Sequence, residues 1–167
     1  YGEILRLKMV ESMVEVYYNS GQFKNTLVFL ERYFEDPFRM YEVLGRFYEK
    51  RGYSEISHSR MRRYEILMEF AGEHSEIPLE KLSDVMLLDL YLRENLKSRP
   101  AFASDQKAYE RMIWAYRKEK KIPKTAHIEV FRDGKITLFD YTDRDPLTNN
   151  ARLTDITDEV NKNYGNV

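Results

Sequence analysis

Apolar residues recur at helical spacing through most of this chain, and that spacing limits the fold more than any other feature. It is densest over residues 3–19, where apolar side chains cover most of the helix surface and leave a narrow polar stripe. A helix of this kind is typical of a buried position, and Gly21 is expected to end it. Because the chain begins without Met, we also expect it to be a piece of a longer protein.

The same spacing predicts five more helices, with residues at their ends that favour helix termini. Asp36 and Pro37 supply an N-cap and a proline at the first helical position, and Gly52 supplies a stop. Ser57 or Ser59 can cap the helix that follows. The expected helices span residues 25–34 and 37–51, then a stretch from this cap to about Gly72, and residues 79–96 and 104–120.

The period of the apolar pattern changes after the last of these helices. Residues 127–132 and 135–141 are β-rich runs separated by Asp133 and Gly134, which is a strong hairpin signal. Alternation divides the apolar side chains into two expected faces: Phe131, Ile136 and Leu138, and Ile128, Val130 and Phe139. Because an isolated hairpin is marginal in water, it must pack on the helices or on a further domain.

These patterns predict a mainly α protein, a compact bundle of about six helices with a C-terminal β-hairpin. We expect residues 1–125 to form the bundle and residues 126–141 to form the hairpin, packed on it as part of the same domain. Residues 142–167 are rich in Asp, Asn and Thr and are expected to form an irregular tail. This tail can hold a short helix from Asp158 to Asn163.

Composition narrows the classes of function. A net charge of -1 argues against a general attraction to nucleic acid or anionic membranes. The sequence has no cysteine, which excludes thiol catalysis, iron-sulfur ligation and disulfides within this segment. No apolar run approaches the roughly 20 residues that a membrane helix needs. We therefore expect a cytoplasmic chain, with neither nucleic acid nor membrane as a partner.

Two charged residues fall where the helical wheel expects apolar side chains. Arg6 lies in the first helix and Asp89 in the fifth. A buried charge is costly unless it is paired, so each needs a partner. They can pair with each other or with tyrosine hydroxyls, or Arg6 can extend into solvent beside Glu3. The result is a network that fixes helix register or, alternatively, a contact to an anionic substrate.

The sequence offers no recognisable reactive centre. His58, Arg60 and two further arginines lie at the start of the fourth helix, where cations oppose the helix dipole; this hints at an acidic partner or a phosphate, although neighbouring glutamates can neutralise them. The three histidines have no i, i+4 pairing, which argues against zinc. There is no phosphate-binding glycine loop and no nucleophile elbow. We predict no catalytic, cofactor-binding or metal-binding residue in this chain.

Four segments resemble one known family. They are YGEILRLKMVESMVEVYYNSGQF, FLERYFEDPFRMYEVLGRFYEKRGY, HSRMRRYEILMEF and MLLDLYL. They are similar to the C-terminal domain of uncharacterised function that follows the cobalamin-binding and radical S-adenosylmethionine domains of bacterial iron-sulfur oxidoreductases. The similarity covers residues 1–100 better than the hairpin region.

The resemblance implies a non-catalytic accessory domain that packs on the upstream catalytic domain of the same chain and shapes substrate access. It implies a 4Fe-4S cluster, S-adenosylmethionine and cobalamin for the parent protein. None is implied on this fragment, because the C-x3-C-x2-C loop that holds the family's cluster is absent. The positions carried over as a candidate interaction surface or buried polar network are Arg6, Tyr17, Tyr18, His58, Arg60 and Asp89.

Two other functions stay open at this point. The stretch YYNSGQFKNTLVFLE looks like one unit of a tetratricopeptide-like repeat, which would make the chain a free-standing helical-hairpin scaffold for a protein or peptide. The abundant carboxylates would also allow a small hydrolase, in which two acidic side chains face each other in a pocket.

Overall fold

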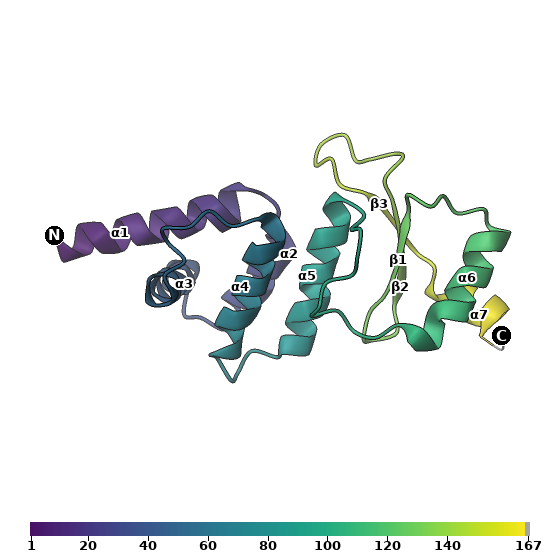
Figure 1. The fold of residues 1–167 in the computed structure, drawn as a ribbon, viewed down its shortest axis with the longest axis horizontal. Coiled ribbons are helices and arrows are strands. Elements are labelled where there is room, and N and C mark those ends of the chain that lie inside the picture. Colours follow the sequence, from purple (N-terminus) through teal and green to yellow (C-terminus); the bar gives the residue numbers. More distant parts are fainter. Residues whose placement is uncertain (166–167) are drawn as a thin grey trace. The chain divides into compact units, whose positions relative to one another are not determined.

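The computed structural model describes residues 1–165, and its chain forms two compact units, residues 1–89 and the residues from 90 onward. Figure 1 shows the order of the elements, which are mainly helices with a small sheet near the C-terminus. The mainly α fold class with a C-terminal β structure is confirmed. The division between the units falls inside one helix, α5 (Leu79–Arg93).

The helices of the first unit begin and end close to the predicted residues. Asp36 caps α3 by accepting a 2.7 Å hydrogen bond from the backbone N–H of Arg39, and Gly52 ends it with a φ of 70°. Ser59, rather than Ser57, caps α4 through the backbone N–H of Arg62. The elements are α1 (Gly2–Met13), a π-helical segment (Val14–Asn19), α2 (Lys24–Glu31), α3 (Pro37–Arg51), α4 (Arg60–Gly72) and the first part of α5.

The first helix changes its winding after Met13, which the sequence did not predict. A π-helical turn holds one more residue than an α-helical turn and shifts the side chains that follow. Tyr17 is fully buried in this segment, whereas the neighbouring Tyr18 is 64% exposed. The expected burial of the first turns is wrong for this chain, because Ile4 and Leu5 are at least half exposed.

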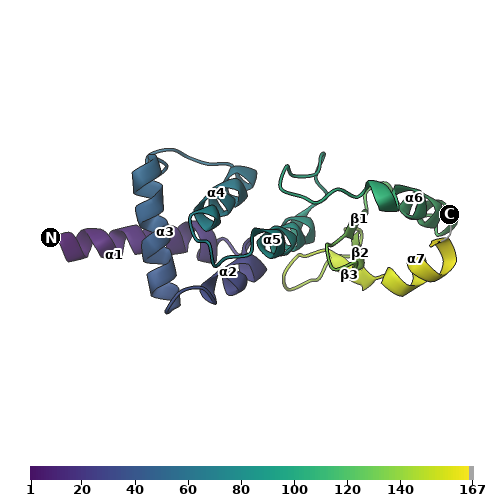
Figure 2. The same ribbon diagram turned by 90° about the horizontal axis from the view of Figure 1, so that it is seen from below.

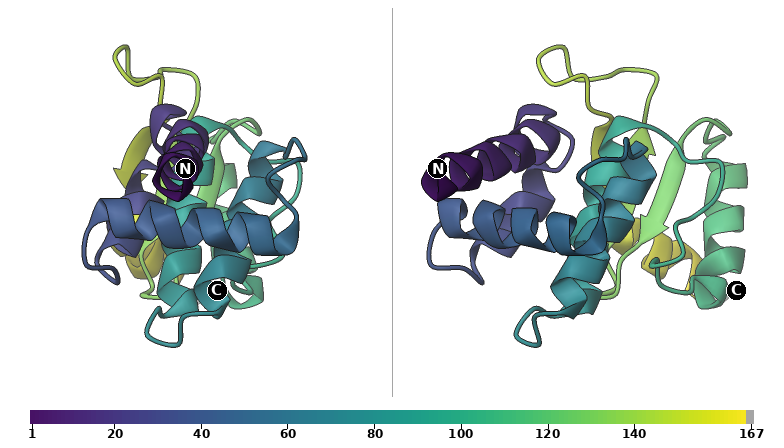
Figure 3. Two further views of the ribbon diagram at one scale, coloured as in Figure 1. Left: turned by 90° about the vertical axis from the view of Figure 1, so that its left-hand side faces the viewer. Right: turned by 60° about the vertical axis from the view of Figure 1, so that its left-hand side comes forward.

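The helices α1 and α3 cross at a point where Gly45 allows close approach. Figure 2 shows α3 running across α1, and the left view of Figure 3 shows the same crossing with α1 seen end-on. A Cβ atom placed on Gly45 would lie 2.4 Å from Cγ of Met9, which is much closer than van der Waals contact allows. The missing side chain of Gly45 therefore makes room for Met9 at the crossing.

The second unit contains the predicted hairpin and a third strand. The strands β1 (His127–Val130), β2 (Ile136–Asp140) and β3 (Arg152–Asp155) form an antiparallel sheet in the order β1-β2-β3. Gly134 turns the hairpin with a φ of 87°. The expectation of an irregular tail is wrong for residues 152–155, which form β3 by pairing with β2.

The register of the hairpin corrects the predicted division of its faces. Ile128 lies opposite Leu138, and Val130 lies opposite Ile136, so these four apolar residues share one face. Side chains alternate between the two faces within each strand, but this alternation does not predict which face the next strand's residues occupy. The five-residue connection (131–135) between the strands sets that register. Phe139 instead lies opposite His127 on the other face.

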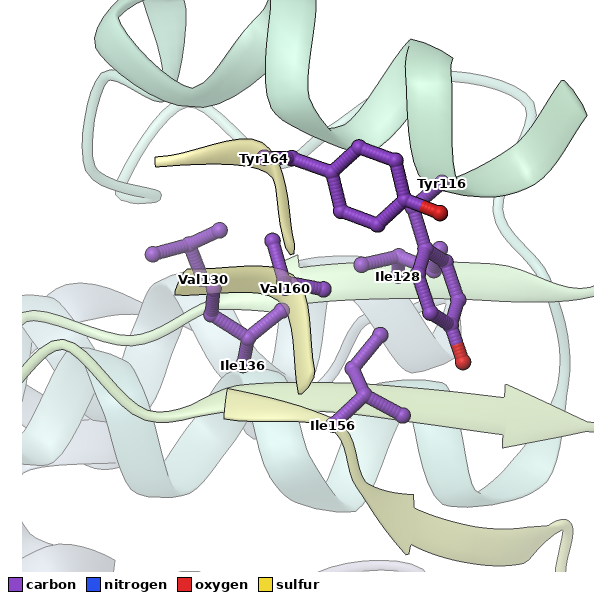
Figure 4. Packing of buried hydrophobic residues seen from close by; sticks show 7 residues of the cluster. All are labelled: Tyr116, Ile128, Val130, Ile136, Ile156, Val160 and Tyr164. Atoms are coloured by element: carbon purple, nitrogen blue, oxygen red, sulfur yellow. The ribbon is translucent and has the colours of Figure 1, made fainter. Parts of the chain in front are cut away.

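Two helices contribute side chains to the core on the apolar face of the sheet, and Figure 4 shows these side chains gathered beside the strands. The helices are α6 (Glu110–Glu119), which follows a short 3-10 turn (Lys107–Tyr109), and α7 (Thr157–Tyr164), close to the short helix expected in the tail. The rings of Tyr116 and Tyr164 meet edge to face, with centroids 6.0 Å apart. The buried cluster is formed by Tyr116, Ile128, Val130, Ile136, Ile156, Val160 and Tyr164.

Loop residues of the second unit satisfy the last carbonyl groups of α5. The hydroxyl of Tyr141 donates to the carbonyl oxygen of Tyr91 at 2.5 Å. The backbone N–H of Ala151 donates to the carbonyl oxygen of Leu92 at 2.8 Å. Arg144 donates from Nη1 to the carbonyl oxygen of Arg93. Because the final carbonyls of a helix have no partner within it, these bonds stabilise its end.

Candidate functional site

Tyr17 lies at the centre of a buried aromatic cluster in the first unit. Its hydroxyl is 2.5 Å from the hydroxyl of Tyr48 and donates to the carbonyl oxygen of Arg63 at 3.2 Å. Because each hydroxyl has one hydrogen, the bond to Arg63 leaves Tyr48 as the donor to Tyr17. Burial, and then the neighbouring Tyr48, raise the pKa of Tyr17, so its hydroxyl stays protonated.

His58 joins this cluster through Tyr53 and Tyr48. Its Nε2 lies 2.9 Å from the carbonyl oxygen of Tyr53, and because a carbonyl only accepts, Nε2 carries the hydrogen. The rings of Tyr48 and Tyr53 both meet the imidazole edge to face. The structure therefore brings together two of the predicted positions, Tyr17 and His58, through the shared neighbour Tyr48.

A small cavity lies beside this cluster. Its volume is about 80 Å³, and its polar lining includes Ser12, Ser54, Ser57, Tyr48, Tyr53 and His58. A cavity of this volume and polarity has room for several water molecules. It can bind water or a small polar group.

A hydrogen-bonded triad extends the cluster along α4. The hydroxyl of Tyr53 donates to the carboxylate of Glu69 at 2.7 Å. The guanidinium of Arg62 donates hydrogen bonds to both Glu69 and the hydroxyl of Tyr53. Burial works against ionisation of Glu69, but the hydrogen bonds from Tyr53 and Arg62 outweigh it and lower its pKa. Arg60, another predicted position, is the half-buried first residue of α4.

Arg6 and Asp89 lie apart from this cluster, and they are not partners of each other. Arg6 forms a salt bridge with Glu42 of α3, with 2.6 Å between Nε and Oε1. Arg39 and Arg46 bond the same carboxylate, whose side chain is 1% exposed. Hydrogen bonds from Arg6 and then Arg39 lower the pKa of Glu42 from 4.5 to about 2.

Asp89 binds the N-terminus of α2. Its Oδ2 accepts from the backbone N–H and the hydroxyl of Thr26, both at 2.7 Å. Its Oδ1 accepts from the backbone N–H and the side-chain amide of Asn25. Burial raises the pKa of Asp89, although these hydrogen bonds act against the rise. The predicted need for a partner is met by a helix terminus, so the role of Asp89 in this fold is structural.

Tyr18 lines an open groove. Its volume is about 690 Å³, within the range of small-molecule and peptide sites. Leu27 and Val28 supply apolar surface, and Lys24 and Glu31 supply one charge of each sign. All the lining residues come from residues 18–31, so the groove lies beside α2 and the turn before it.

The second unit holds a buried polar network that was not predicted from the sequence. Glu129 is fully buried, and its carboxylate is bonded by Arg99 at 2.5 Å and by His127 at 2.7 Å. The imidazole of His127 stacks on the ring of Tyr91 at 3.6 Å between centroids. Burial and then Glu129 raise the pKa of Tyr91 to about 12. The signal that could have revealed it is the carboxylate of Glu129 between two apolar strand residues.

Two general features of the described part of the chain bear on function. Within residues 1–165, no three His, Asp or Glu side chains gather in a way that could hold a metal ion. Within the same residues, every helix is too short or too polar to cross a lipid bilayer.

Comparison with known proteins places the chain in a family. The family model described as "Protein of unknown function (DUF4080)" matches residues 1–159. Neither the curated proteins nor the solved structures gave a match.

Proposed function

The chain belongs to the DUF4080 family of unknown function, and we propose that it is a non-catalytic accessory domain that docks on a catalytic domain of the same protein. In this proposal the parent is a cobalamin-dependent radical S-adenosylmethionine enzyme, and this domain shapes access to its substrate. The cytoplasm is the expected compartment.

The observation that carries the docking role is the apolar surface of α1. Ile4, Leu5 and Leu7 are between 50% and 58% exposed, and Tyr1 is 95% exposed. Large apolar side chains gathered on two helical turns favour a partner surface, because burying them removes apolar area from water. The sequence resemblance of residues 1–100 supports an upstream catalytic domain as that partner.

The cofactors belong to the proposed parent rather than to this chain. A 4Fe-4S cluster needs cysteine thiolates, and the sequence has none. The residues of this chain therefore do not fit the role of cluster ligands. In the proposed parent, the cluster, S-adenosylmethionine and cobalamin are held by the upstream domains.

The reading frame upstream of Tyr1 gives the first test. The proposal expects a C-x3-C-x2-C triplet there, and its absence would contradict a radical S-adenosylmethionine parent. A second test asks whether the isolated chain has the activity itself. After attempted cluster reconstitution, the chain is expected to produce no reductive cleavage of S-adenosylmethionine, and turnover would reject a non-catalytic role.

The docking surface is tested in the longer protein with Leu5→Glu and Leu7→Glu. Each change puts a charge on the exposed apolar surface of α1, Leu5 and Leu7 lying on different sides of the helix, so we expect faster proteolysis between the domains if that side is in the interface. Val28→Glu is the control, because Val28 is 51% exposed on a different helix and should leave the cleavage rate unchanged. If all three variants and the unchanged protein are cleaved at the same rate, α1 is not part of the interface.

A second candidate is the peptide-binding scaffold, and the groove beside Tyr18 is the observation that favours it. An apolar floor with a charge of each sign near it suits an extended or helical peptide. In this case Tyr18→Ala should weaken peptide capture, while Leu5→Glu should have no effect. The opposite pattern favours the accessory domain.

A further inference from the structure

Three arginine side chains converge on one buried carboxylate where α1 packs on α3. Oε1 of Glu42 accepts from Nε of Arg6 at 2.6 Å and from Nη2 of Arg46 at 2.7 Å. Oε2 accepts from Nη1 of Arg39 at 2.8 Å and from Nη2 of Arg6 at 3.1 Å. A carboxylate offers about four acceptor sites, so Glu42 has no capacity left for a further donor.

The charges of this cluster do not balance. Three guanidinium groups face one carboxylate, which leaves two positive charges in excess. The nearby carboxylate of Asp36 accepts the backbone N–H of Arg39, so it lies at the N-terminus of α3 and caps the helix. Its negative charge offsets part of this excess, and an anion bound outside Glu42 would meet the positive field that remains.

The arginines also keep hydrogen-bond donors for such an anion. Each guanidinium carries five N–H donors, and Glu42 takes only one or two from each. The side chains of Arg6 and Arg39 are 46% exposed, and that of Arg46 is 59% exposed. Because Glu42 already holds the three side chains in place, a ligand pays less conformational entropy to order them.

We propose that Arg6, Arg39 and Arg46 bind the terminal phosphate group of a small phosphorylated molecule. A phosphate monoester carries close to two negative charges at neutral pH, so it offsets the excess of the cluster better than a singly charged ligand does. Its three terminal oxygens can accept from three separate guanidinium groups, whereas a ligand carboxylate brings one charge and two oxygens. This site shares α1 with the proposed docking surface, because Arg6 lies between Leu5 and Leu7 in the sequence, but it does not depend on the docking role.

The test is a titration of the chain with inorganic phosphate and with pyrophosphate, followed by calorimetry and by the NMR signals of the arginine Nε–H groups. Acetate and chloride at matched ionic strength measure simple screening. Arg39→Gln and Arg46→Gln each remove one donor group and leave the Arg6–Glu42 pair in place. Lys8→Gln is the matched control, because Lys8 is exposed on α1 and forms no part of the cluster.

We expect saturable binding of phosphate and pyrophosphate that shifts the signals of the three arginines. Each Gln variant should bind about tenfold more weakly, while Lys8→Gln binds as the unchanged chain does. Circular dichroism confirms that a variant is folded, and either arginine variant alone decides the test if the other fails to fold. No saturable binding, equal binding of acetate, or an equal loss in Lys8→Gln would overturn the proposal.

Discussion

The carboxylate of Asp89 on α5 accepts two 2.7 Å hydrogen bonds from Thr26, one from its backbone and one from its hydroxyl, although the residues are 63 positions apart. An N-cap usually comes from the residue that precedes its helix. Here Phe23 holds that position and has no acceptor in its side chain. The cap is supplied through tertiary structure, and it ties α2 to α5.

Replacement of Asp89 should therefore destabilise the first unit. Burial disfavours the charge of Asp89 and raises its pKa, but its hydrogen bonds to α2 would be lost. Asp89→Ala leaves the donors of Thr26 and Asn25 unpaired, and Asp89→Asn turns an amide donor toward some of them. We expect each change to cost about 1–3 kcal/mol of unfolding free energy, measured by urea denaturation. Glu11→Gln, on the exposed stripe of α1, is the charge control. A loss below that of the control would show that the cap is dispensable.

Glu42 should give the chain an acid-sensitive component of stability. Its pKa falls from 4.5 to about 2 on folding, so the unfolded state binds its proton at the higher pH. The stabilisation from ionised Glu42 is complete above pH 4.5 and is lost as the pH falls through about 2. Thermal unfolding at several pH values should show this loss as a fall in melting temperature toward acid pH. Glu42→Gln should make the melting temperature depend less on pH and should lower it at neutral pH. An unchanged slope in Glu42→Gln would assign the loss to other carboxylates.

Gly45→Ala should reveal the close packing of α3 on α1. Alanine favours a helix over glycine by up to about 1 kcal/mol, but its Cβ would collide with Met9. Overpacking should prevail, for a net loss of about 1–2 kcal/mol. In a Met9→Ala background the same change should become neutral or stabilising. Equal effects in both backgrounds, measured as a double-mutant cycle, would contradict the contact.

The hydroxyl chain through Tyr17 predicts unequal effects of two similar substitutions. Tyr17→Phe removes a bond to Tyr48 and a bond to Arg63, and it leaves the buried Tyr48 hydroxyl without that acceptor. Tyr48→Phe removes one bond and leaves Tyr17 donating to Arg63. We expect losses of about 2 kcal/mol and about 1 kcal/mol respectively in chemical denaturation. Tyr18→Phe, at an exposed position, should be silent, and a reversed order of the two losses would reverse the inferred direction of donation.

Local features of the sequence were enough to predict most helix ends and the hairpin. The N-caps at Asp36 and Ser59 act on backbone groups three residues away, and Gly134 acts within its own turn. Such signals need no knowledge of the rest of the chain. The third strand carried no such signal, because all four residues of Arg152–Asp155 are exposed and form a strand only by pairing with β2.

The candidate site was harder to predict than the elements that carry it. The sequence showed that Arg6 and Asp89 needed partners, because charge on an apolar arc is costly. It did not identify Glu42, which lies on a helix with many apolar neighbours and is buried. The π-helical turn that buries Tyr17 and exposes Tyr18 had no signature in the spacing of residues 14–19.

The sequence by itself determined where most helices begin and end, the turn of the hairpin, and which charges had to be satisfied. Only the tertiary structure decided that Arg6 meets Glu42 across 36 residues and that Asp89 caps α2 across 63. The reason is physical: caps and turns depend on neighbours in the chain, whereas ion pairs depend on which helix surfaces pack together. That packing is set by the side chains of the whole unit at once.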